Sequence, residues 1–142
     1  GLYYLNVNKK DPYATVITDA KELHDKHQYE LAKKTLTDYL ATKPRDKTKK
    51  SNAYTELIAI SREQHDDAKV EAYAKQAETD GVTPGYDVYM ALAEVAVAKK
   101  QNQQAIDYYT KALNIVENDK SATAPPTKHY IEACIAALKK GS

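Results

Sequence analysis

The sequence predicts an all-α fold, an α-solenoid of about three helix–turn–helix repeats closed by a C-terminal capping helix. Gly and Pro number only 4 and 5, whereas the helix formers Ala, Lys, Glu and Leu are plentiful. Three stretches share a basic residue first, Gln third and Ala seventh, and the alanines Ala32, Ala68 and Ala105 lie 36 and then 37 residues apart. Helical repeats at such a period are typical of a solenoid.

The 142 residues suffice for one domain, which we place at residues 13–142 behind an N-terminal arm of residues 1–12. Phe and Trp are missing, so the 12 tyrosines supply all the aromatic side chains. The net charge is only +1, and the single Cys134 excludes an internal disulfide framework.

We place the first repeat at residues 13–46. Asp11 is a good N-cap and Pro12 suits the first helical position, so we expect a helix to begin there. A short turn near His27 then leads to a second helix over residues 29–42, which Pro44 ends. The apolar residues of the first helix recur at helical spacing: Val16, Ile17, Ala20 and Leu23.

The middle repeat covers residues 49–82. Its first helix, residues 49–63, follows the basic segment PRDKTKK, which we expect to be a solvated loop or a frayed helix start. Its second helix, residues 66–79, stops before Gly81, a residue that adopts the left-handed conformation easily. The apolar stripe of the first helix is broad: Ala53, Tyr54, Leu57, Ile58 and Ile60.

The third repeat covers residues 86–119. Thr83 as N-cap and Pro84 begin its first helix, and the run AEVAVAK continues that helical pattern rather than forming a strand. A second helix follows over residues 102–117, and a capping helix over residues 126–139 ends the domain.

The recurring alanines have a physical explanation. Where two helices of a pair cross, their backbones approach closely and only a small side chain fits. We therefore expect Ala32, Ala68 and Ala105 to mark the crossings. One turn later, Leu36, Ala72 and Tyr109 fill the space beside them.

These residues give the chain a resemblance to the tetratricopeptide repeat (TPR) family, over roughly 110 of the 142 residues. The third repeat matches best and the first matches well, although Asp19 stands where the family usually has Leu. The middle repeat matches least, with Glu56 in a small-residue position, so we expect its first helix to be rotated or shifted. The matching residues of the first and third repeats are Val16, Ala20, Leu23, Tyr29, Ala32, Leu36, Pro44, Tyr89, Leu92, Ala93, Ala96, Ala105, Tyr109 and Ala112.

The resemblance implies a right-handed superhelix whose first helices line a concave groove for a peptide or protein. Ile17 and Lys21 occupy the positions where the family's carboxylate clamp has Lys and Asn, so we expect no such clamp. By resemblance the partner-binding groove would be lined by Ile17, Lys21, His24, Tyr54, Leu57, Ile60, Met90, Glu94 and Val97.

No catalytic or cofactor motif stands out: the sequence has no Gly-rich phosphate loop, GxSxG, HExxH or CxxC. We therefore predict no enzyme activity, no cofactor and no metal. The histidines His24, His27 and His65 could form a surface metal site with Asp66, but structural zinc sites usually use four ordered ligands with cysteine. We interpret these residues as solvated turn histidines.

We therefore expect a non-enzymatic scaffold that binds a protein or peptide partner, within a larger or membrane-anchored protein. The alternatives are a self-associating structural module and a ligand-binding module that serves an enzyme elsewhere in the parent chain. The basic segment at residues 43–50 lacks interleaved aromatic residues, so we predict no nucleic-acid partner. It could contact an acidic protein or a membrane surface.

The apolar start GLYYL leaves two interpretations open. Residues 1–12 are either an arm that frays or packs on the first helix, or the juxtamembrane end of a removed transmembrane or signal segment. The location therefore stays undetermined between a membrane-anchored domain exposed to solvent and a cytoplasmic protein.

Overall fold

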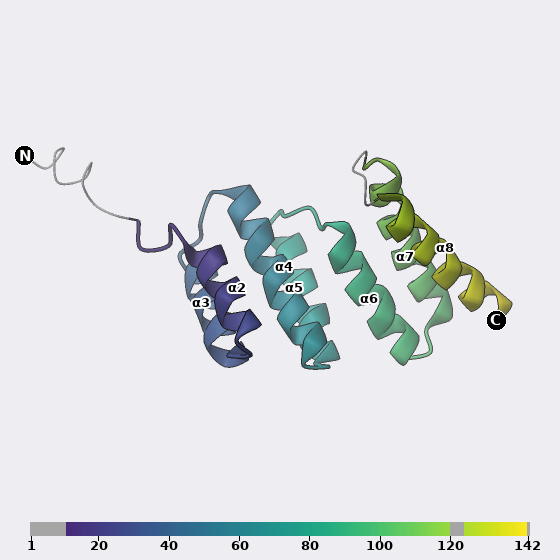
Figure 1. The fold of residues 1–142 in the computed structure, drawn as a ribbon, viewed down its shortest axis with the longest axis horizontal. Helices are drawn as coiled ribbons and strands as arrows, with labels where there is room; N and C mark the ends of the chain where they lie inside the picture. Colours follow the sequence, from purple (N-terminus) through teal and green to yellow (C-terminus); the bar gives the residue numbers. More distant parts are fainter. Residues whose placement is uncertain (1–10, 120–123, 142) are drawn as a thin grey trace, which may run out of the picture.

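The structure, a computed structural model, describes residues 11–119 and 124–141 (Figure 1). These residues form seven helices and no strand, which confirms the all-α prediction. The helices are α2 (Val16–Asp25), α3 (Tyr29–Ala41), α4 (Lys47–Glu63), α5 (Asp67–Thr79), α6 (Tyr86–Ala98), α7 (Asn102–Glu117) and α8 (Ala124–Lys140).

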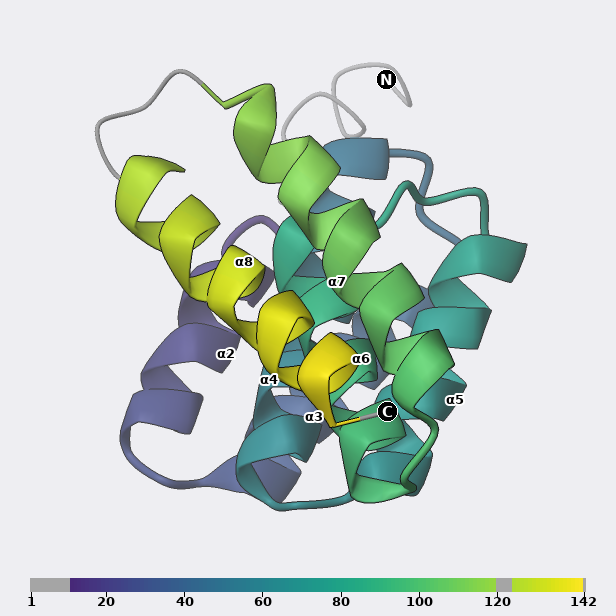
Figure 2. The same cartoon turned by 90° about the vertical axis from the view of Figure 1, so that its right-hand side faces the viewer.

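The helices form three pairs, α2 with α3, α4 with α5 and α6 with α7, set in a row as a repeat-like architecture. Figure 1 shows the row from the side, and Figure 2 looks along it with α8 nearest the viewer. The first helices α2, α4 and α6 contact one another in order, and each second helix contacts the first helix of the next pair. The backbones of the second helices α3, α5 and α7 do not approach one another in this way.

Five helices begin at other residues than predicted, of which α5 is one residue late at Asp67 and α8 two residues early at Ala124. Residues 12–15 form a turn, in which Asp11 accepts a hydrogen bond of 2.9 Å from the Tyr13 amide, so α2 begins at Val16 rather than Pro12. Helix α4 begins earlier than predicted, at Lys47, because Asp46 caps it by accepting a 3.0 Å hydrogen bond from the Lys49 amide. Helix α6 begins at Tyr86, after Gly85.

The turns within the three pairs share one backbone geometry. His27, His65 and Lys100 each have a positive φ, of 60°, 57° and 60°. In each turn the amide one residue later donates to a carbonyl five residues back, for example Gln28 to Leu23 at 2.9 Å. This is the Schellman arrangement that ends a helix. The three residues are therefore equivalent, and they lie 38 and then 35 residues apart.

This spacing corrects the predicted alignment of the middle pair. Ala32 and Ala105 are 0% exposed at their helix crossings, as predicted. In the middle pair, however, Val70 occupies the equivalent position at 1% exposure, whereas Ala68 is exposed. Ala72 is likewise exposed, and Ala74 is buried in its place. The prediction that Ala68 and Ala72 lie in the crossing is wrong by two residues.

Helix α8 closes the C-terminal end of the row by packing on α7. Ile131 of α8 is fully buried in a cluster with Met90, Ala93 and Tyr109, and Cys134 lies half-buried at its edge. Within the described part of the chain, no helix combines the length and apolar character needed to cross a bilayer.

Candidate interaction surfaces

The turn residues define which positions the three first helices share. Counted back from the turn residue of its own pair, each of the predicted groove residues Ile17, Lys21 and His24 of α2 has one equivalent position on α4 and one on α6. We call the resulting set the first-helix face: Ile17, Lys21 and His24 on α2, Thr55, Ala59 and Arg62 on α4, and Glu94 and Val97 on α6, where Met90 at the position equivalent to Ile17 is buried.

Four of the residues predicted to line the groove are buried instead. Tyr54, Leu57 and Ile60 belong to the core cluster between the first two pairs, and Met90 packs against α8. Their side chains are therefore not available to a partner in this structure. The sequence alignment missed Thr55, Ala59 and Arg62 because it placed the middle pair two residues out of register. The histidine that recurs in the turn, as His27 and His65, was the one hint in the sequence, and it is a weak one because histidine does not by itself mark a turn.

His24 connects α2 to α4 through two carboxylates. Its Nδ1 lies 2.6 Å from Glu56 Oε1, and its Nε2 lies 2.5 Å from Glu63 Oε2. Both ring nitrogens can donate at once only when the imidazole is protonated. Burial lowers the pKa of His24, but the hydrogen bonds and negative charges of Glu63 and Glu56 outweigh it and raise the pKa above 6.5. The protonated form of His24 therefore stabilises the contact between these helices.

Two further side chains extend this cluster to α3. The Tyr29 hydroxyl donates to Glu63 Oε1 at 2.7 Å, and His27 Nδ1 lies 2.7 Å from the same hydroxyl. The hydrogen bonds from Tyr29 and His24 lower the pKa of Glu63. Since His24 and His27 serve these contacts, they do not converge with His65 on an ion. Among the described residues, no group of three or more His, Cys, Asp or Glu side chains is placed to hold a metal.

Arg62 connects α4 to α6. Its guanidinium forms a two-pronged ion pair with Glu94, in which Nε donates to Oε2 at 2.6 Å and Nη2 contacts Oε1. Tyr130 of α8, 56% exposed, lies close enough that the charges of Glu94 and Arg62 both act on its hydroxyl. An exposed aromatic ring therefore stands beside a charge pair.

The first-helix face contains a small hollow of about 100 Å³ between α4 and α6. Thr55, Ala59 and Arg62 form its α4 side, and Asp87 and Ala91 belong to its α6 side. The hollow exists because residues 55, 59 and 91 are small.

A larger groove, about 700 Å³, lies between the second helices α5 and α7. Tyr89 and Leu92 of α6 line it from below, because α6 packs between the two helices. We call it the α5–α7 groove. Helical geometry places Tyr89 and Leu92 on a different side of α6 from the first-helix face.

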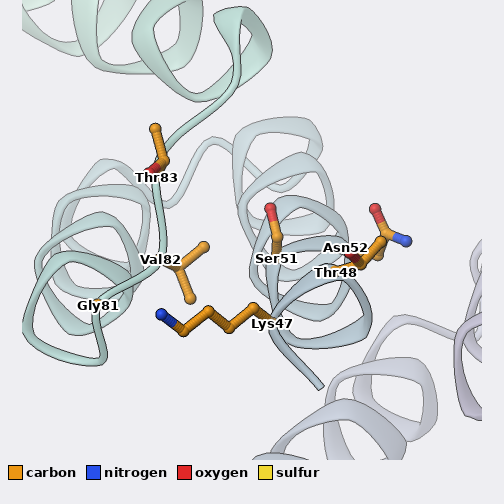
Figure 3. A pocket seen from close by; sticks show the side chains of 7 residues that line it. All are labelled: Lys47, Thr48, Ser51, Asn52, Gly81, Val82 and Thr83. Carbon is orange, nitrogen blue, oxygen red and sulfur yellow. The ribbon is translucent and has the colours of Figure 1, made fainter. Parts of the chain in front are cut away.

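A third hollow, about 330 Å³, lies where α4 begins, beside the connection from α5 to α6. Figure 3 shows the Lys47 side chain running toward Val82 and Gly81, while the Ser51 hydroxyl points away from it. Thr48, Asn52 and Thr83 complete its polar lining. Apart from Val82, its side chains are exposed or half-buried, so burial does not hold them in place.

The predicted basic segment is partly helical and partly neutralised. Lys47, Lys49 and Lys50 belong to α4. Lys49 lies 3.8 Å from Asp11 and over the Tyr39 ring, and Lys50 lies 3.7 Å from Asp80. These two lysines are thus less available to an acidic partner than a solvated loop would make them.

A comparison of the chain with family models, curated proteins and solved structures finds no match.

Proposed function

We propose that this chain is a non-enzymatic protein-interaction scaffold, a TPR-like α-solenoid that holds a peptide or protein segment along its first-helix face. One observation carries the proposal: α2, α4 and α6 lie side by side and present equivalent residues, among them Ile17, Thr55 and Ala59, on one continuous side. Repeat proteins built in this way bind partners along such extended surfaces.

The side chains of this face suit a peptide. Val97 and Tyr130 are exposed apolar or aromatic groups, and the hollow beside Ala59 has room for a small apolar side chain. The charged groups His24 and Arg62 are already held by Glu63 and Glu94. Little side-chain freedom is therefore lost there on binding, which favours affinity.

Site-specific photo-crosslinking of the full chain in its own cell tests the proposal. The photoreactive amino acid p-benzoylphenylalanine is placed at one position per variant. The test positions are Lys21 and Val97 on the first-helix face, and the exposed control positions are Asp38 on α3 and Gln76 on α5. We expect one common adduct from positions 21 and 97 that is missing from both controls. With the identified partner, Val97→Asp should weaken binding at least tenfold and Asp38→Ala should not.

Two outcomes would contradict this function. Equal crosslinking from all four positions would show that the first-helix face has no special role. An adduct between two copies of this chain would instead support a self-associating module.

A further inference from the structure

The α5–α7 groove results from the register of the middle pair. Because Val70 rather than Ala68 enters the helix crossing, Ala68 and Ala72 face outward on α5. Both are lining residues of the groove, so its α5 wall has a low apolar part at Ala68 and Ala72, beside the charged residues Glu71, Lys75 and Glu78. The backbones of α5 and α7 do not approach each other closely enough to close it. At about 700 Å³, it lies within the size range of ligand pockets.

The base and the α7 wall of the groove are aromatic. The rings of Tyr89 and Tyr108 stack with centroids 6.4 Å apart and planes inclined at 26°. Lys111 Nζ lies 5.6 Å from the Tyr89 ring and 5.9 Å from the Tyr108 ring. The tyrosines thus hold the Lys111 ammonium group at the groove through cation–π interactions.

The charges at the groove favour an anionic occupant. Lys75 on α5 and Lys111 on α7 stand on opposite walls, and neither forms an ion pair with any residue that the structure describes. Glu71, on the α5 wall, is already paired with Lys99 at the end of α6. Glu78 is then the one acidic lining residue that no described ion pair neutralises.

From this geometry we infer that the α5–α7 groove is a second docking site, for an acidic peptide segment with an aromatic or aliphatic side chain beside its carboxylates. The apolar side chain lies on Ala68, Ala72 and the tyrosine rings, and the carboxylates reach Lys75 and Lys111. Complementary charge fixes the orientation of such a segment, and the apolar contact adds binding energy. The groove shares no residue with the first-helix face, so this site does not depend on the function proposed above.

Selection from a displayed library of random 12-residue peptides tests the chemistry without presupposing a partner. The full chain is immobilised, and enriched peptides are synthesised and titrated. We expect the enriched sequences to combine Asp or Glu with Leu, Phe, Tyr or Trp. Neutral or basic enriched peptides, or no enrichment, would overturn the inference.

Variants then locate the site. Lys75→Gln combined with Lys111→Gln should weaken the acidic peptides at least tenfold, and Ala72→Trp, which fills the groove, should do the same. Glu78→Gln should tighten binding two- to threefold, because it removes the unpaired acid. Lys47→Gln, an exposed lysine outside the groove, is the matched control and should change nothing. Equal binding by the double variant and the parent, or loss of binding with Arg62→Gln alone, would overturn the site.

Discussion

The imidazole of His24 and the carboxylate of Glu63 lie 2.5 Å apart and connect α2 to α4. Glu56 bonds the other ring nitrogen, and Tyr29 bonds the other oxygen of Glu63. One histidine proton thus supports a contact among the three helices α2, α3 and α4. The contact between the first two pairs should therefore respond to pH.

We predict that the free energy of unfolding falls as the pH rises from 6 to 8. The pKa of His24 is raised above 6.5 in the folded protein, so its contribution is fully present below about pH 6.5 and is lost as the pH rises through the folded value. His24→Gln should cost about 1.5–3 kcal/mol at pH 6, as expected for charge-assisted hydrogen bonds. Urea unfolding at several pH values measures both effects.

His129→Gln is the control for this prediction, because His129 is an exposed histidine on α8. It should keep the pH dependence of the parent protein, whereas His24→Gln should flatten it between pH 6 and 8. A slope that survives in His24→Gln would mean that other groups cause it.

A pair of alanine substitutions tests the register of the helix crossings. Ala105→Leu should cost about 1–3 kcal/mol through overpacking, because Ala105 is fully buried. Ala68→Leu should change stability by less than about 0.5 kcal/mol, because Ala68 is exposed. Denaturant unfolding of the two variants gives the comparison. Similar losses of unfolding free energy in both variants would support the alignment in which Ala68 lies at a helix crossing.

The helices themselves were predictable because their ends carry local signals. Pro44 and Gly81 lie where α3 and α5 end, and Asp66 caps α5 by accepting a hydrogen bond from the Lys69 amide at 3.1 Å. The register of the middle pair was not predictable from identity alone. It is set by His27, His65 and Lys100 in the left-handed conformation, and these residue types carry no turn signature of the kind that glycine gives.

The same slip explains the misplaced part of the candidate site. Aligning Ala68 with Ala32 moves two of the expected groove positions on α4 onto Leu57 and Ile60, which belong to the core. Tyr54, which is also in the core, lies one residue beyond the third position that this alignment gives. The slip did not affect the predictions for α2 and α6. The spacings of 38 and 35 residues between the turn residues add up to the same total as the spacings of 36 and 37 residues between the aligned alanines, so the first and third pairs stay in register. The α5–α7 groove could not be predicted, since it depends on which alanines stay outside.

Tyr54 was predicted to line the groove but is buried, so we expect its substitution to affect stability through packing. Tyr54→Ala should cost about 3–5 kcal/mol of unfolding free energy, as large-to-small changes of buried aromatic side chains do. Tyr54→Phe should cost less, about 1.5–3 kcal/mol, because it removes the 2.7 Å hydrogen bond to the Asp80 carboxylate and leaves the ring in place. Thermal unfolding measures both, and a stable Tyr54→Ala variant would place this side chain outside the core.

The Arg62–Glu94 pair offers the converse case, in which binding should change more than stability. Both side chains are substantially exposed, so their coupling in a double-mutant cycle of Arg62→Ala and Glu94→Ala should be about 0.2–1 kcal/mol of unfolding free energy. Their place beside Ala59 and Tyr130 predicts a larger effect on the affinity of a partner bound at the first-helix face. Loss of Arg62 leaves the charge of Glu94 uncompensated at the bound segment.

Calorimetric titration measures this coupling, with the partner that photo-crosslinking identified titrated into each of the four proteins of the cycle. A binding coupling no larger than the unfolding coupling would mean that the pair only joins α4 to α6, and that the partner contacts another part of the face.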